Sequence, residues 1–256
     1  MNPNLCQVAL RPRGPLEAFD LAFRFARERH GPLGKLLMLT LFPLWLLTIP
    51  ACLLTDGHLA LLLVPIVVGP FVQAPFTVLS GRLLFASQYP IFSVVKDVLT
   101  QLPALLTAWA IGVLGWAISS LSCFTFAVLV QGSLLYHTET ALLERVGPQR
   151  GLRRTFRLAG GNFGIALVGA LSRWVLLAFF GLVAEAIGQG VVNFILQLGQ
   201  PFGSLWSGQV TPFLLGGLLF AQAAHAVYRL FLYLDVRTRV EGWDIQVGLL
   251  AARTSR

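Results

Sequence analysis

Charged residues are scarce in this sequence. Only 12% of its 256 residues are Asp, Glu, Lys or Arg, whereas about 25% are charged in an average soluble domain. Hydrophobic residues make up 56% of the chain. This composition is far outside the usual range of soluble domains, and it indicates a protein embedded in lipid.

Cysteine is rare, and the common catalytic motifs are absent. Cys6, Cys52 and Cys123 form no CxxC pair, which excludes a zinc or redox signature. Cys52 and Cys123 fall near the outer ends of predicted helices, so a disulfide and two separate apolar thiols remain open alternatives. There is no phosphate-binding loop, GxSxG or HExxH, and the four histidines are scattered. We predict no catalytic residue, no cofactor and no metal site, and we expect a protein that is not an enzyme.

The N-terminal residues lack the features of a secretory signal. Residues 1–14 contain neither an apolar core nor a small-residue cleavage site. Over 15–29, apolar residues recur at spacings of three or four while charged residues occupy the other faces. This pattern predicts an amphipathic helix on the membrane surface, with Pro15 in its first turn.

Apolar runs long enough to cross a bilayer follow this helix. A span needs roughly 20 apolar residues, and such runs occupy 36–54, 59–79, 103–143, 162–187 and 211–234. The run 103–143 is too long for one helix, so we divide it at 119–122 and expect about six transmembrane helices. Segment 188–209 is broken by Gly and Pro, and it is interpreted as either interfacial or re-entrant.

Basic residues predict the orientation. The stretch 136–171 joins two apolar runs through a connection with five arginines and only Glu139 and Glu144 as acids, which is typical of a cytoplasmic loop. With both termini inside, all of the 19 Lys and Arg except Arg173 fall on the cytoplasmic side. We therefore predict an all-α integral membrane protein with amphipathic interfacial helices, N-in and C-in. It forms a single membrane domain over 1–256, with an arm and interfacial helix (1–35), a six-helix bundle (36–234) and a cytoplasmic tail (235–256).

The net charge of +8 indicates the kind of partner. In a soluble protein such an excess would suggest nucleic acid, but here the basic residues lie at the ends of apolar runs. We expect contacts with the lipid bilayer and its anionic phospholipids, and with other membrane proteins or further copies of the chain, but not with nucleic acid.

Three residues form a candidate intramembrane polar site. Arg173 lies about eleven residues into its span, where a guanidinium costs roughly 2.5 to 3.5 kcal/mol on insertion scales. It must therefore face the protein, either as an anion or lipid-headgroup site or as an internally bonded charge. On the last span, a stripe of small residues at Gly217 and Ala221 continues to His225 and Arg229. That face is either a water-accessible vestibule or a packed face from which Arg229 reaches the interface.

A second set of residues predicts contacts on the cytoplasmic side. Charges of both signs alternate just after the last span, and we hypothesise that this tail folds back onto the basic connection, pairing with Arg153 or Arg154. The alternative is a solvated tail, worth at most about 1 kcal/mol per exposed pair. The candidate ion-pair or lipid contacts are Glu144, Arg153, Arg154, Arg157, Asp235, Arg237, Arg239, Glu241 and Asp244.

Three segments carry a family resemblance. The basic "GLRRTFRLAGGNF" (151–163), the C-terminal "FLYLDVRTRVEGWDIQVGL" (231–249) and the N-terminal "PLEAFDLAFRFARERHGPLGKLL" (15–37) resemble uncharacterised bacterial membrane proteins related to the membrane domain of glycerophosphoryl diester phosphodiesterases. The resemblance implies a multi-pass protein of the bacterial cell inner membrane. In family members that are enzymes a catalytic barrel follows the membrane domain, and we expect none here because the sequence ends at Arg256.

Two functional classes remain. The first is a non-enzymatic subunit or scaffold of a membrane complex that contacts anionic lipid. The second is a transporter or permease for a lipid or small solute. The sequence favours the first, because intramembrane charges are few and no span has the paired Gly/Pro break of a midplane binding site.

Overall fold

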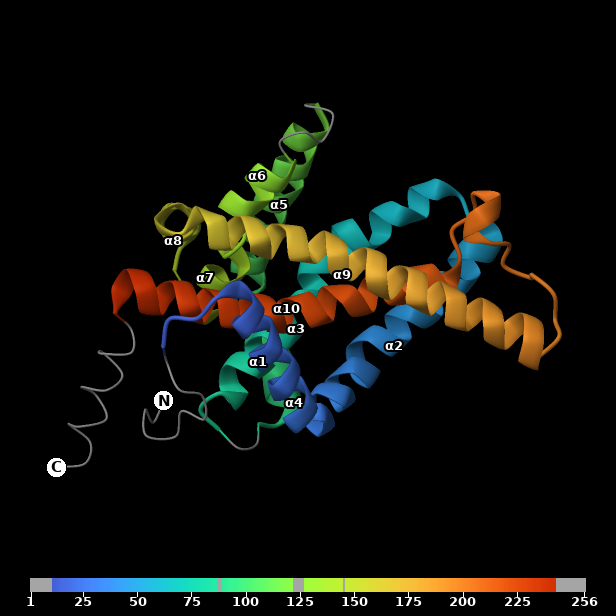
Figure 1. Ribbon diagram of the computed structural model, residues 1–256, viewed down its shortest axis with the longest axis horizontal. Coiled ribbons are helices and arrows are strands. Elements are labelled where there is room, and N and C mark those ends of the chain that lie inside the picture. Colours follow the sequence, from blue (N-terminus) through green and yellow to red (C-terminus); the bar gives the residue numbers. More distant parts are fainter. Residues whose placement is uncertain (1–10, 87–88, 122–126, 145, 243–256) are drawn as a thin grey trace. The chain divides into compact units, whose positions relative to one another are not determined.

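The computed structural model describes residues 11–86, 89–121, 127–144 and 146–242 (Figure 1). Over these residues the chain is helical and contains no strand, in agreement with the predicted all-α class. Cys6, Cys123 and Asp244 lie outside the described residues. The helices are α1 (Pro15–Glu28), α2 (His30–Leu54), α3 (Leu63–Leu83), α4 (Ile91–Thr100), α5 (Leu102–Leu121), α6 (Ala127–Ser133), α7 (His137–Leu143), α8 (Pro148–Gly161), α9 (Phe163–Gly190) and α10 (Pro212–Glu241).

Several of these helices are long and apolar enough to cross a membrane. Four meet both conditions, and a fifth is added if α4 and the first part of α5, which are bent by 68° at their break, form one span. Where a separate span was expected at the end of 103–143, the described residues form α6 and α7, with seven residues each, fewer than the roughly 20 that a span needs. The protein is thus compatible with a multi-pass membrane protein, while the count of six and the orientation remain predictions. The four are His30–Leu54, Leu59–Leu83, Phe163–Ile195 and Pro212–Glu241.

Two helices are longer than the sequence predicts. Helix α10 does not end at residue 234, where the cytoplasmic tail was expected to begin, but continues to Glu241. The extension is held by ion pairs one turn apart, Asp235 with Arg239 at 2.9 Å and Arg237 with Glu241 at 3.1 Å. Helix α9 passes residue 187 and continues through one π turn, Val191–Ile195, because apolar residues persist and no proline intervenes. The start of segment 188–209 is therefore helical and continuous with α9.

The chain divides into two compact units. The first unit comprises Met1–Leu33, Ala74–Leu171 and Ala226–Arg256, and the second comprises Gly34–Gln73 and Ser172–His225. This division does not test the expectation of a single membrane domain, which remains a prediction.

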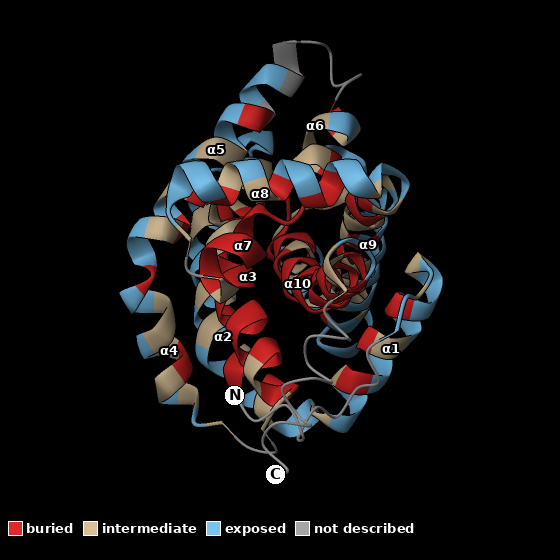
Figure 2. Cartoon of the chain, turned by 90° about the vertical axis from the view of Figure 1, so that its left-hand side faces the viewer, coloured by how far each residue is buried: buried red, intermediate tan, exposed pale blue. Residues whose placement is uncertain are grey.

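The second half of α10 is the core of the first unit. Leu230 and Leu232 are completely buried although they point to nearly opposite sides of the helix, as expected for a helix surrounded by others (Figure 2). Helix α1 begins at Pro15, as predicted, and buries Ala18, Ala22 and Phe25 on one face. The ring of Phe25 packs edge-on against Phe231 of α10, with centroids 5.4 Å apart.

The second unit is held together by close helix contacts. A Cβ atom on Gly217 of α10 would lie 2.2 Å from the carbonyl oxygen of Phe180 on α9, so the two backbones touch at this position. The indole N–H of Trp45 on α2 donates to the carbonyl oxygen of Pro212 at 2.9 Å. Small residues permit such approaches in lipid, where the hydrophobic effect does not drive helices together.

The turn after α2 is tied to the segment before α10. Gly57 has φ +67°, a conformation that favours glycine, and its carbonyl oxygen accepts a hydrogen bond from the N–H of Val210 at 2.8 Å. Cys52 is buried beside Val210, Leu214 and Leu215. Its suggested pairing with Cys123 cannot be described, since Cys123 lies outside the described residues.

Candidate functional site

The charged side chains of the first unit converge on the C-terminal part of α10. Arg229, Tyr233 and Arg237 follow one another at intervals of four residues, so they occupy one face of the helix. Their acidic partners are Glu139, inside α7, and Glu144, which follows α7 directly. We call the residues that pair on this face the α10 charged network.

Glu139 and Arg229 form its buried part. The Nε atom of Arg229 lies 2.5 Å from Oε1 of Glu139, and the two side chains are 6% and 0% exposed. Arg229 is therefore inside the unit rather than extended to an interface. Among the described residues, Oε2 of Glu139 and Nη2 of Arg229 have no hydrogen-bond partner. Two charges buried this deeply depend on each other, because desolvation of either alone costs several kcal/mol.

Glu144, Arg154, Arg237 and Glu241 form the outer part, in which the signs of charge alternate. Arg154 binds Glu241 with both terminal nitrogens, at 2.9 Å each, and its Nε atom contacts Glu144. Arg237 completes the set, with its Nε atom 3.1 Å from Glu241 and 3.8 Å from Glu144. Burial alone would lower the pKa of Arg154, but the hydrogen bonds to Glu144 and Glu241 raise it above its usual value. The four charges cancel, so this part joins α8 to α10 without net charge.

Tyr233 links the outer part to the core. Its hydroxyl donates to Oε1 of Glu144, and its ring lies 5.6 Å from the guanidinium carbon of Arg237. The ring of Tyr136, which precedes α7, also packs near Tyr233, with the two ring centroids 6.1 Å apart. Tyr233 thereby combines hydrophobic burial with a bonded hydroxyl, as buried tyrosines usually do.

The same end of α10 holds the arm before α1. Asp235 accepts a hydrogen bond from the backbone N–H of Arg13 and pairs with Arg239. Arg239 also donates to the carbonyl oxygen of Arg13 at 2.6 Å. The hydroxyl of Tyr228 donates to the carbonyl oxygen of Pro15 at 3.3 Å. These bonds fix the start of α1 to α10 through backbone groups.

The candidate residues predicted from the sequence divide into several groups. Arg154, Arg237, Glu144 and Glu241 are brought together, and Asp235 pairs with Arg239. Arg153 and Arg157 lie on the exposed face of α8 and are in none of the described ion pairs, and Asp244 lies outside the described residues. Of the intramembrane candidates, Arg229 belongs to the first unit, whereas the half-buried Arg173 and the buried His225 belong to the second.

Glu139 was missed by sequence reasoning. Its neighbourhood, His137-Thr138-Glu139, has no partner cluster nearby in the sequence, and Arg229 is 90 positions away. An acidic residue at the end of a bilayer-length apolar run is itself a signal, since such residues are usually paired. Among the described residues no three His, Cys, Asp or Glu side chains group as metal ligands would.

Comparisons with protein-family models, with curated proteins and with solved structures find no match for this chain. The resemblance to the membrane domain of glycerophosphoryl diester phosphodiesterases therefore stays a prediction.

Proposed function

We propose that this chain is a non-enzymatic membrane protein of the bacterial inner membrane that acts as a subunit or scaffold of a membrane complex and contacts anionic phospholipid. The observation that carries this proposal is the two-sided character of α8. Gly151, Thr155, Leu158 and Ala159 are buried on one face. Arg150, Arg153 and Arg157 are exposed at spacings of three and four, on one other face.

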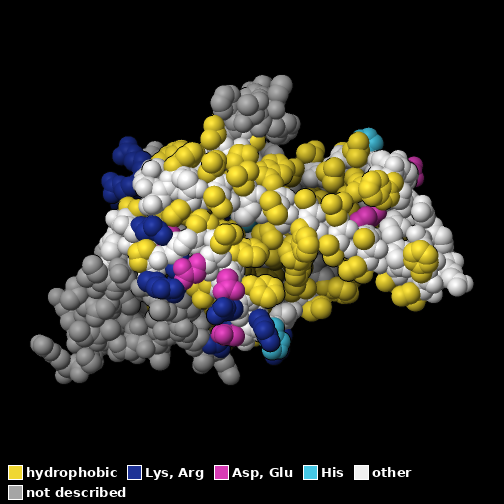
Figure 3. All heavy atoms as spheres, viewed as in Figure 1, with side chains coloured by type: hydrophobic (Ala, Val, Ile, Leu, Met, Phe, Trp, Pro, Cys, Tyr) yellow, Lys and Arg dark blue, Asp and Glu magenta, His cyan; other side chains and the backbone are white. Residues whose placement is uncertain are grey.

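The exposed face of α8 suits the surface of a lipid bilayer. Phe156, next to Arg157, is 48% exposed and can enter the acyl boundary while the arginines meet phosphate groups. Each basic residue near an anionic membrane surface contributes about 1 kcal/mol of attraction. Figure 3 shows Lys and Arg side chains gathered over α8, the end of α10 and α1, all in the first unit.

The α10 charged network supports a structural role. Arg154, Arg237, Glu144 and Glu241 neutralise one another and join α7, α8 and α10. This arrangement holds α8 in place beneath its exposed arginines. A fixed basic helix is what a scaffold needs in order to present one surface to lipid and others to partner proteins.

Purification from native membranes in mild detergent tests the proposal. The full-length chain should retain anionic phospholipid and a stoichiometric protein partner. The variant Arg150→Gln/Arg153→Gln/Arg157→Gln should lose the anionic lipid, whereas the matched triple Lys variant should keep it because the charge remains. Equal lipid retention by the wild type, the Gln variant and the Lys variant would contradict the proposed lipid contact of α8. Solute movement by the chain alone after reconstitution would argue for the transporter class instead.

Cysteine labelling tests the predicted orientation. In a background without native Cys, single cysteines at Gly57 and Gln200 should react with an impermeant thiol reagent in intact cells, and one at Gln149 should not. Labelling at Gln149 would overturn the orientation. Absence of labelling at both Gly57 and Gln200 would overturn the span count.

A further inference from the structure

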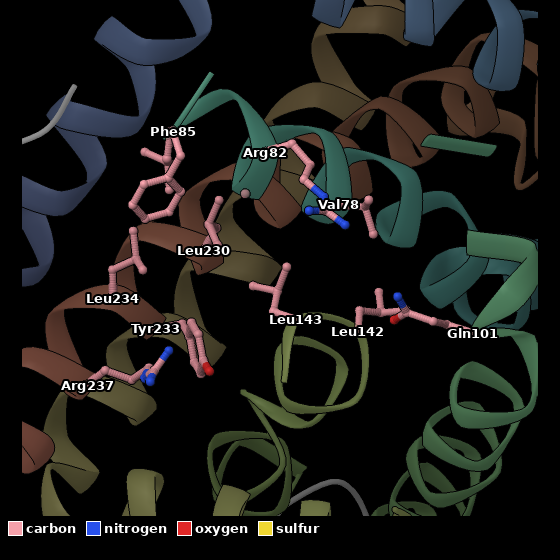
Figure 4. A pocket seen from close by; sticks show the side chains of 12 residues that line it. Val78, Arg82, Phe85, Gln101, Leu142, Leu143, Leu230, Tyr233, Leu234 and Arg237 are labelled. Carbon is pink, nitrogen blue, oxygen red and sulfur yellow. The ribbon is translucent and has the colours of Figure 1, made fainter. Parts of the chain in front are cut away.

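The first unit contains a cavity of about 310 Å³ beside the α10 charged network. Its walls come from α3 and the two residues after it, from Gln101 between α4 and α5, from the end of α7, and from α10. Val78, Gly81, Arg82 and Phe85 line one side, and Leu230, Tyr233, Leu234 and Arg237 line another. Both sets have the spacing i, i+3, i+4, i+7, so each is a single helical face. In Figure 4 these two sets face the same space.

The lining is apolar except at four residues. Arg82, Gln101, Tyr233 and Arg237 supply the polar groups, and among the described residues no Asp or Glu lines the cavity. Most binding sites for small molecules have this form, with apolar walls and a few polar groups that set orientation. The apolar residues include Val78, Leu84, Phe85, Leu142, Leu143, Leu230 and Leu234.

The two arginines are held by carboxylates that do not line the cavity. Nη2 of Arg82 lies 3.0 Å from Asp97, which also accepts a hydrogen bond from Tyr89 at 3.0 Å. Nε of Arg237 lies 3.1 Å from Glu241 and 3.8 Å from Glu144. A guanidinium has five N–H donors, so Arg82, which is anchored to Asp97 through Nη2, can bind a further oxyanion. Anchoring also reduces the entropy lost on binding, because the side chain is already ordered.

The apolar walls and the two arginines together select a ligand that has both an apolar part and an anionic group. Inorganic phosphate would satisfy the arginines but leave the apolar walls without a partner. A neutral hydrocarbon would fill the walls but gain nothing from the arginines. We propose that this cavity binds one amphipathic anion, namely a single acyl chain that carries a carboxylate or phosphate.

The size and position of the cavity agree with this ligand. A volume of about 310 Å³ is at the lower end of the range for small-molecule sites, so it suits one chain and its head group rather than a whole two-chain lipid. Its lining residues lie at the ends of predicted spans, next to the basic connections, where inner-leaflet head groups are expected. The inference goes beyond the proposed scaffold function and does not depend on it, because Arg150, Arg153 and Arg157 do not line the cavity.

Displacement of a fluorescent fatty acid from the full-length chain in neutral detergent tests the proposal, with empty micelles as background. Laurate and dodecyl phosphate should both displace the probe, and the stronger of the two identifies the preferred head group. Dodecanol and inorganic phosphate should not displace it at the same concentrations. Equal displacement by dodecanol would overturn the role of the arginines, and equal displacement by inorganic phosphate would overturn the role of the apolar walls.

Two variants locate the site. Leu143→Trp fills the cavity from a half-buried position and should weaken probe binding at least about tenfold, while Leu114→Trp, at a position that is 65% exposed and outside the lining, should not. Arg82→Gln should weaken binding about tenfold through loss of a charged hydrogen bond, and Arg82→Lys less. Unchanged binding in Leu143→Trp and Arg82→Gln, with thermal melting preserved, would refute the site. The triple Gln variant of α8 should bind the probe normally, which separates this result from the test of the scaffold function.

Discussion

The two units of this protein stabilise their buried polar groups with different kinds of bond. The first unit pairs full charges, as in Glu139 with Arg229. The second unit has only Lys35, Asp56, Arg173 and Glu185 as charged residues, and its described internal bonds mostly use amides, hydroxyls and backbone carbonyls. Gln222 shows the pattern, because it accepts from the Gln73 amide and donates to the carbonyl oxygen of Pro65 at 3.2 Å.

Charged and neutral bonds hold different parts of the protein in place. In the first unit, charges attach short segments to α10, namely α7, α8 and the arm before α1. In the second unit, neutral bonds connect long apolar helices to one another. Glu185 is the exception, and its partners Thr211, Gln189 and the N–H of Leu205 all belong to the end of α9 or the loop that follows. Charge is thus used where irregular segments must be held, and amides are used between helices, where an ion would be costly.

The largest effect should come from breaking the buried ion pair of the first unit. Glu139→Leu leaves Arg229 buried without its carboxylate, and we expect a loss of about 3–5 kcal/mol in the free energy of unfolding. Glu139→Leu/Arg229→Met should recover most of that loss, since neither charge then remains. Chemical unfolding in detergent measures both. A double variant no more stable than the single one would show that the pair itself, rather than the orphaned charge, carries the stability.

The next effect concerns the neutral contact between α9 and α10 in the second unit. Gly217→Ala places a methyl group against the carbonyl oxygen of Phe180, and overpacking of this kind costs about 1–3 kcal/mol. Gly190→Ala is the matched control, because nothing lies within 4 Å of its Cβ position. It should be neutral or slightly stabilising, and equal melting temperatures for the two variants would contradict the close contact.

A smaller effect is expected for the amide pair of the second unit. A double-mutant cycle with Gln73→Leu and Gln222→Leu should give a coupling energy of about 0.6 kcal/mol, and at most about 1.7 kcal/mol, as measured for hydrogen bonds between membrane helices. The measurement is the unfolding free energy of the wild type, both single variants and the double variant. A coupling of several kcal/mol would mean that this neutral pair is as strong as a charged pair, which contradicts the difference between the two units.

The smallest effect should be found in the outer part of the α10 charged network. Arg154 is 26% and Glu241 20% exposed, so we expect a coupling of about 1 kcal/mol or less from Arg154→Gln and Glu241→Gln. Added salt should weaken it, while the pair of Glu139 and Arg229 should respond much less because it is shielded from ions. Melting temperatures at low and high salt compare the two pairs directly. An equal response would mean that both are similarly exposed.

Some features of this protein follow from the sequence alone. Bilayer-length apolar runs predicted an all-helical protein with helices long enough to cross a membrane. In lipid the backbone N–H and C=O groups of such a run must bond to each other, as they do in a helix. The periodicity of 15–29 predicted α1. The arginines of the basic connection placed Arg154 among the candidates, and the alternating charges after residue 234 placed Arg237 and Glu241 there. These signals are local, since each depends on residues within one element.

How these elements combine depends on contacts between residues that are far apart in the sequence. Ala104, Ala108 and Gly112 form a stripe of small residues at four-residue spacing, as Gly217 and Ala221 do. Nothing lies within 4 Å of a Cβ position on Gly112, whereas a backbone oxygen meets that of Gly217. The end of α10 at Glu241 depended on pairs formed within and beyond the helix. The partnership of Glu139 with Arg229 joins positions 90 residues apart. A single sequence reports the period of one helix, whereas a buried charge is stabilised by whatever distant segment the fold places against it.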